Sequence, residues 1–199
     1  MSTLLFLVTF LALVVILVRA VVWGVRRKPV IPSLGLAGIV IAAYALFWAV
    51  LYVKSSDRTV PLGTDVCFDD WCATVTGVEN PARLGDESGG VRPNGHFIIL
   101  HVKMSNHARG IAQKPSEPRI HIIDSQGRSW PASEAGQHLL EMTRGVQPAL
   151  DARLELHQSI ETQIAFDIPA GATGLRALIE EGPPITLLLL PEDREVFPI

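Results

Sequence analysis

The sequence LGLAGIVIAAYALFWAVLYV, residues 34–53, decides the fold class, because it contains no charged side chain. At 1.5 Å per residue, a helix of this length spans about 30 Å, the thickness of a bilayer's hydrocarbon core. Small residues recur in it at alternating steps of three and four, at Gly35, Gly38, Ala42, Ala45 and Ala49. This spacing puts them on one helical face, where they let helix backbones approach closely in lipid. The stretch predicts a transmembrane helix with a packing face, although apolar helices are often rich in Gly and Ala.

A second apolar stretch precedes it, at residues 4–24, in which Arg19 is the only charged residue. The connection at residues 25–33 is short enough to predict an antiparallel hairpin of two transmembrane helices. Three basic residues lie in this connection, Arg26, Arg27 and Lys28. By the positive-inside rule the connection is cytoplasmic, and both chain ends lie on the outer side of a bacterial inner membrane. A cleaved signal peptide is the alternative, but residues 4–24 lack the basic start and the small-residue cleavage site of one.

Several side chains of the hairpin are candidates for contact with lipid or a partner. Arg19 lies near the cytoplasmic end, where it can extend to the headgroups or pair with an acidic group of a neighbouring subunit. We expect the first helix to fill half of the small-residue face of the second. The aromatic side chains of Tyr44, Trp48 and Tyr52, at steps of four, then remain for lipid or a neighbour. The helices lack His, Cys, Asp and Glu, so we expect no cofactor bound by their own side chains, though they could border lipids or pigments held by partners.

Charge is distributed unevenly along the chain. The part that follows residue 53 holds 13 of the 17 basic residues and all 20 acidic ones, a net charge of −7. This balance argues against nucleic acid as a partner.

Residues 54–64 form a polar linker, after which short alternating segments predict an all-β domain at residues 65–199 outside the cytoplasm. Residues 96–105 alternate most clearly and predict a central strand. Residues 133–143 fit a short helix or an irregular crossing, and residues 81–95 a polar loop. So many short strands indicate a β-sandwich. The predicted strands are residues 65–68, 72–79, 96–105, 119–124, 128–131, 150–156, 159–168, 175–181 and 185–190.

Two segments carry a family resemblance, IIDSQGRSW at residues 122–130 and TQIAFDIP at residues 162–169. They resemble the bacterial immunoglobulin-like modules of unknown function found on secreted antigens and lipoproteins. In that family a strand that ends in an Asn turn, like Asn106 here, precedes a D-x-x-G hairpin, and a Phe-Asp-Val-Pro-like strand follows. The resemblance covers about residues 62–190 and implies an immunoglobulin-like β-sandwich without an activity. The two membrane helices depart from the family, in which a signal sequence or lipobox is usual.

Few residues are candidates for chemistry. Cys67 and Cys72 are the only cysteines, and their spacing in a tight hairpin favours a disulfide over a metal site, which needs more ligands. The layout also looks like subunit II of haem-copper oxidases, but that family's copper ligands are absent. His96, His101 and His107 lie close to Met104 in sequence, but strand alternation keeps them from converging, so we interpret them as surface residues.

The hypothesis with most support is a non-catalytic accessory subunit of a larger bacterial membrane complex, with an energy-transducing host, photosynthetic or respiratory. Its expected partners are other membrane subunits and the lipid bilayer. The alternative is a membrane-tethered periplasmic binding or sensing module. In that case an exposed Trp71, in the turn between the first two predicted strands, would be its hot spot.

Overall fold

The structure is a computed structural model that describes residues 2–27, 29–54, 57–68, 70–85, 93, 95–182 and 194–199. Side chains are described from residue 7 onward, except those of residues 51–54. The chain divides into a helical unit and a β-rich unit, and each is described by itself.

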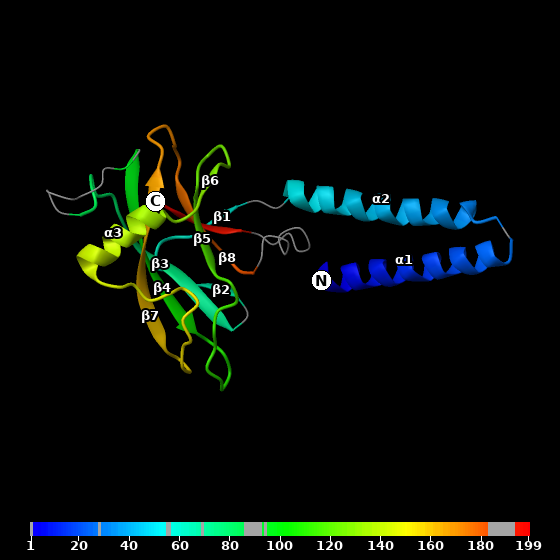
Figure 1. The fold of residues 1–199 in the computed structure, drawn as a ribbon, viewed down its shortest axis with the longest axis horizontal. Helices are drawn as coiled ribbons and strands as arrows, with labels where there is room; N and C mark the ends of the chain where they lie inside the picture. The colour runs from blue at the N-terminus through cyan, green and yellow to red at the C-terminus, as the bar shows by residue number, and fades with distance from the viewer. Residues whose placement is uncertain are drawn as a thin grey trace. The chain divides into compact units, whose positions relative to one another are not determined.

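The helical unit consists of α1 (Ser2–Val25) and α2 (Ile31–Lys54) (Figure 1). Leu7–Val25 and Ile31–Val50 have mean hydropathies of 2.5 and 2.0, so both helices are long and apolar enough to cross a membrane. The second helix begins at Ile31, three residues earlier than predicted. Pro32 is tolerated there because the first turn of a helix does not use its backbone N–H groups.

The contact between the two helices differs from the prediction. The less exposed side chains of α2 include Tyr44 and Trp48, whereas the predicted small-residue face, Gly35, Gly38, Ala42, Ala45 and Ala49, is exposed. The partly buried side chains of α1 also fall on one face, Thr9, Ala12, Leu13, Ile16, Ala20 and Trp23. The prediction that α1 fills the small-residue face is therefore wrong. Small residues with reduced exposure are Ala12 and Ala20 in α1 and Ser33 and Ala37 in α2, and none of these belongs to the predicted face.

The described residues of the β-rich unit form two sheets (Figure 1). Sheet A has the order β1-β9-β8-β5-β6, with β1 and β9 parallel and the other neighbours antiparallel. It consists of β1 (Arg58–Thr59), β5 (Arg119–Ile123), β6 (Ser129–Trp130), β8 (Arg176–Glu180) and β9 (Glu195–Pro198). Sheet B is antiparallel, with the order β2-β3-β4-β7. It consists of β2 (Val66–Phe68), β3 (Trp71–Glu79), β4 (His96–Asn106) and β7 (Ser159–Ile168).

One hydrophobic core lies between the sheets and makes the unit a β-sandwich. Leu100 and Phe166 contribute to this core from sheet B, and Ile122 and Phe197 contribute from sheet A. The predicted alternation of β4 is confirmed, because its even-numbered residues from Ile98 to Met104 enter this core. The opposite face of β4 is also partly apolar.

A helix covers part of that opposite face. It is α3 (Glu134–Arg144), so the helical alternative for residues 133–143 is confirmed. Ser133 caps it, with Oγ accepting a hydrogen bond from the backbone N–H of Gly136 at 3.1 Å. Leu140 packs with Phe97 and Ile99 of β4 in a second, smaller core.

Two strand predictions differ from the structure. Residues 150–156 form no strand; Leu154 alone makes an isolated bridge, to Gln113. The short strands β1 and β9 were not predicted, although both complete sheet A. The predicted strand at residues 185–190 lies outside the described residues.

Candidate functional site

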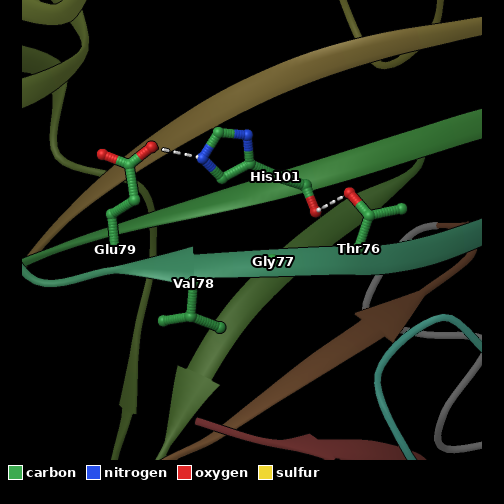
Figure 2. A pocket seen from close by; sticks show the side chains of 5 residues that line it. All are labelled: Thr76, Gly77, Val78, Glu79 and His101. Carbon is green, nitrogen blue, oxygen red and sulfur yellow. Dashed lines mark hydrogen bonds and ion pairs between the residues drawn. The ribbon is translucent and has the colours of Figure 1, made fainter.

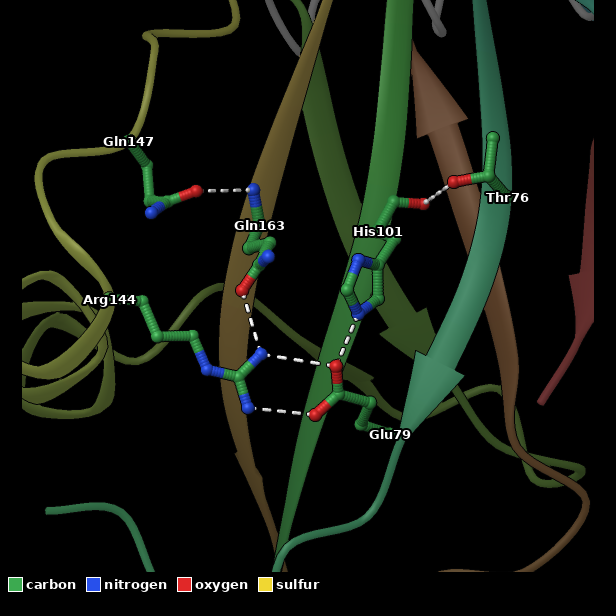
Figure 3. Close-up of polar contacts among 6 residues, drawn as sticks. All are labelled: Thr76, Glu79, His101, Arg144, Gln147 and Gln163. Atoms are coloured by element: carbon green, nitrogen blue, oxygen red, sulfur yellow. Dashed lines mark hydrogen bonds and ion pairs between the residues drawn. The ribbon is translucent and has the colours of Figure 1, made fainter.

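A polar network lies on the face of sheet B that points away from the main core (Figure 3). Its members are Glu79 at the end of β3, His101 in β4, Gln163 in β7 and Arg144 at the end of α3. The pairing register explains why they meet, because His101 lies opposite both Gly77 and Gln163. Strand residues two apart point to the same face, which adds Glu79 beside Gly77.

Arg144 and Glu79 form a two-pronged ion pair. The Nη1 and Nη2 groups of Arg144 donate to Oε1 and Oε2 of Glu79 at 3.0 and 2.8 Å, and Nη1 also donates to Oε1 of Gln163 at 2.9 Å. Nε2 of His101 donates to the Glu79 carboxylate at 2.6 Å. The hydrogen bonds from Arg144 and then from His101 lower the pKa of Glu79 to about 2, although burial opposes this shift. The network therefore ties the end of α3 to sheet B through one carboxylate.

Removing this carboxylate should change stability in a pH-dependent way. Because the folded state lowers the pKa of Glu79 from 4.5 to about 2, its contribution is complete above about pH 4.5 and is lost as the pH falls through 2. We expect Glu79→Gln to lower the free energy of unfolding by about 1 kcal/mol at pH 7, since the pair is partly exposed to solvent. The two proteins should converge near pH 2. Urea unfolding at both pH values measures this, with the exposed Glu155→Gln as control; an equal loss at both values would contradict it.

A hollow of about 340 Å³ lies beside this network, lined by Thr76, Gly77, Val78, Glu79 and His101 (Figure 2). It arises where the pairing of β3 with β4 shifts between Val75 and Gly77, as in a β-bulge. Gly77 leaves the ring of His101 open on one side, because a Cβ atom there would lie 3.6 Å from its Cδ2 atom. Across the described residues, no three His, Cys, Asp or Glu side chains are placed to hold a metal ion.

The outward edge of β7 is covered by side chains. The amide of Gln137 donates from Nε2 to the carbonyl of Gln163 and accepts at Oε1 from the N–H of Ala165, both at 3.1 Å. Oε1 of Gln147 accepts from the N–H of Gln163 at 3.1 Å, and the N–H of Ser133 donates to the carbonyl of Ala165 at 2.8 Å. Residues 133–147 are called the edge cover below. This segment takes the place of a neighbouring strand at two residues of β7.

The predicted disulfide is present, but Trp71 is not exposed. Cys67 and Cys72 lie directly opposite each other in β2 and β3 and are bonded. Trp71 is only 2% exposed; its ring stacks on Phe68, and its Nε1 group donates to Glu181 at 2.8 Å. The prediction of an exposed hot spot at Trp71 is therefore wrong. The large indole ring is more stable when it packs against the sandwich core.

The other candidate residues are not brought together. The guanidinium of Arg19 lies 4.3 Å from the ring centroid of Trp23, and Arg26 and Arg27 are exposed after α1. Lys28 and the side chain of Tyr52 lie outside the described part of the chain.

The prediction that the three histidines and Met104 do not converge agrees with the structure, because Met104 lies in the core, His101 lies on the opposite face of β4, and His96 is exposed. His107 lies 3.1 Å from Ser105. Sequence reasoning missed the pairing of His101 with Glu79, since register alone brings these residues together.

No protein-family model matches the chain, and no curated protein matches it. Among solved structures, the chain is similar to a conserved hypothetical protein from Bacillus anthracis, with 14% identity and a TM-score of 0.49 over 60% of this chain and 87% of that one. It is also similar to MPT63, a secreted protein of Mycobacterium tuberculosis, with 11% identity and a TM-score of 0.46 over 73% and 99%. An uncharacterised β-sandwich protein from Clostridium difficile has 12% identity and a TM-score of 0.45 over 73% and 95%. All three TM-scores are below 0.5, so the sandwich is established by its own two packed sheets.

Proposed function

We propose that the chain is a non-catalytic accessory subunit of a larger membrane complex. In this proposal the helical hairpin spans the membrane and binds a neighbouring subunit, and the β-sandwich lies on the outer face. The observation that carries it is the exposed small-residue face of α2, which the contact with α1 leaves uncovered. A Cβ atom added at Gly35 or Gly38 would meet nothing within 4 Å, so a neighbouring helix could approach closely there.

The proposed location follows from the hairpin and the disulfide together. Disulfides persist in oxidising compartments, so the Cys67–Cys72 bond supports a β-sandwich that lies outside the cytoplasm. The basic residues between the helices favour a connection on the cytoplasmic side of a bacterial inner membrane. Tyr44 and Trp48 are not part of the proposed partner surface, because these side chains lie on the face that α2 turns toward α1. Because no described contact points to a photosynthetic or respiratory host, only a large membrane complex is proposed.

Substitution within the small-residue face tests this function. We expect Gly38→Leu/Ala42→Leu to reduce the amount of partner protein that co-purifies in mild detergent by about tenfold or more, because bulky side chains prevent close helix approach. Ile39→Leu, on the same exposed helix surface, is the matched control and should retain the partners. Recovery of the unmodified chain as a free monomer would contradict the proposal.

We also propose that the β-sandwich is an immunoglobulin-like module of the kind found on secreted bacterial proteins. Two of the residues that suggested the resemblance have structural roles that support this. Asn106 ends β4 and holds the following loop, and Asp124 binds the backbone N–H groups of Gln126 and Arg128 in its turn. Both side chains stabilise loops of the β-sandwich, which is a structural role. The sensing alternative loses its main support, since Trp71 is buried.

A further inference from the structure

At Gln163 and Ala165, the edge of β7 makes most of its hydrogen bonds to side chains and not to a neighbouring strand. The N–H and carbonyl groups of Gln163 and Ala165 make four hydrogen bonds to the edge cover, and three of these use the side-chain amides of Gln137 and Gln147. A glutamine amide carries the same donor and acceptor as a peptide group. A strand laid along β7 could therefore replace these bonds one for one, and the exchange would cost little hydrogen-bond energy.

The edge cover has few other attachments. Gly136 and Leu140 are the buried residues of α3, and Leu140 is the only large one. At the other end of the helix, Arg144 holds Glu79 and Gln163. Met142 and Val146 are 70% and 87% exposed, so they contribute little to holding the segment in place. Lifting the cover would break this ion pair and would uncover Phe97 and Ile99, against which Leu139 and Leu140 pack.

The sequence of β7, SIETQIAFDI, suits pairing with itself. Two β7 strands related by a two-fold axis run antiparallel, and a register centred on Gln163 puts Glu161 opposite Ala165 and Ser159 opposite Asp167. No like charges then face each other. The same register puts Ile160 opposite Phe166, an aromatic and β-branched pair that stabilises antiparallel sheets.

We propose that the edge cover is a displaceable guard of β7, and that a second copy of this chain pairs with β7 through its own β7 when the cover is lifted. The closed cover keeps the edge unavailable, as natural sheets commonly require. Lifting it joins two copies of sheet B into one continuous sheet. This contact is separate from the helix face on which the proposed host complex depends.

Three variants of the full chain in detergent test the proposal. Gln137→Ala/Gln147→Ala removes the edge amides, and Leu140→Ala releases the helix by another route. Gly136→Cys/Ala165→Cys locks the cover, because a Cβ atom at Gly136 would lie 3.3 Å from the Cβ atom of Ala165, near disulfide range. Gln126→Ala, in an exposed turn, is the matched control. Light scattering during size-exclusion chromatography gives the mass of each.

We expect both released variants to dimerise with a dissociation constant about tenfold or more below that of the unmodified chain. A tenfold change in the dissociation constant corresponds to about 1.4 kcal/mol of binding free energy. The locked and control variants should have the same dissociation constant as the unmodified chain. In the released background, Gln163→Cys should form an intermolecular disulfide, because the two copies of this residue face each other. Ser159→Cys should not, since its copies would lie about 26 Å apart. Released variants that stay monomeric, or a dimer that forms equally in the locked variant or fails to cross-link at 163, would overturn the proposal.

Discussion

Asn106→Ala is expected to lower the free energy of unfolding by about 3 kcal/mol or more. Asn106 is 2% exposed, and its amide holds the loop that follows β4. Nδ2 donates to the carbonyls of Ile111, Leu154 and Glu155 at 3.0, 3.0 and 3.2 Å, and Oδ1 accepts from the N–H of Ala108 at 2.8 Å. Alanine would remove the partner of the Ile111 carbonyl and of the buried Ala108 N–H. The carbonyls of Leu154 and Glu155 would each lose one of two hydrogen bonds, because each also accepts from a backbone N–H.

Urea unfolding of the full chain in detergent, followed by tryptophan fluorescence, measures this loss. Asn106→Asp separates the two halves of the amide, because aspartate keeps the acceptor but has no N–H to donate. It should be at least as damaging as alanine. Gln158→Ala is the matched control, since this amide accepts one hydrogen bond, from the N–H of Glu155, in the same region. A loss below 1 kcal/mol for Asn106→Ala would show that the loop holds without the amide.

Gly95→Ala is expected to destabilise the β-sandwich by about 2–4 kcal/mol. Gly95 directly precedes β4, where the chain passes close to the end of β7. A Cβ atom there would lie 2.2 Å from the carbonyl oxygen of Ile168 and 2.3 Å from the backbone nitrogen of Ala170, closer than real Cβ atoms come. Because both obstacles are backbone atoms, the strand itself has to move. The first rung of the β4 and β7 pairing, His96 with Ile168, should then be lost.

Hydrogen exchange of the full chain locates this effect, with faster exchange expected for the first residues of β4. Gly171→Ala is the control, because it lies in the turn after β7 and a Cβ atom there would meet nothing within 4 Å. If both variants unfold at the same urea concentration as the unmodified chain, the close approach at Gly95 is not required for folding.

The alternation of apolar and polar residues correctly predicted strands in which every second side chain is buried in the core. The alternation in β4 gave both its length and the face that enters the core. The spacing of Cys67 and Cys72 predicted a hairpin with a disulfide, because four intervening residues leave few other geometries. Both predictions depend on the spacing of residues that are close in the sequence, and a single sequence shows such spacing directly.

The errors arose where tertiary contacts outweigh local pattern. Leucines at 150, 154 and 156 look like a strand, but only Leu154 is buried, and Asp151 forms an ion pair with Lys114 at 2.9 Å. The small-residue face of α2 was predicted to pack against α1. In the structure, Tyr44 and Trp48 lie on the side of α2 that contacts α1. A spacing shows that residues share a face, but not which neighbour meets that face.

The polar network and the edge cover could not have been predicted by the same means. Glu79, His101 and Arg144 come from three elements, and their meeting depends on strand register and on where α3 ends. Gln137 and Gln147 are ordinary glutamines in the sequence. Their role depends on the backbone of β7, which no spacing between glutamines reveals.

The parallel pairing of β1 with β9 sets an order for the assembly of the protein. Arg58 pairs with Glu195, 137 positions later, and Asp57 forms an ion pair with Arg194 over the same separation. A ribosome adds residues one at a time, so α1 and α2 are both synthesised well before the strand that closes sheet A. The sandwich therefore stays open until β9 has been made, and its last strand can join its first only after the 137 positions between them have been synthesised.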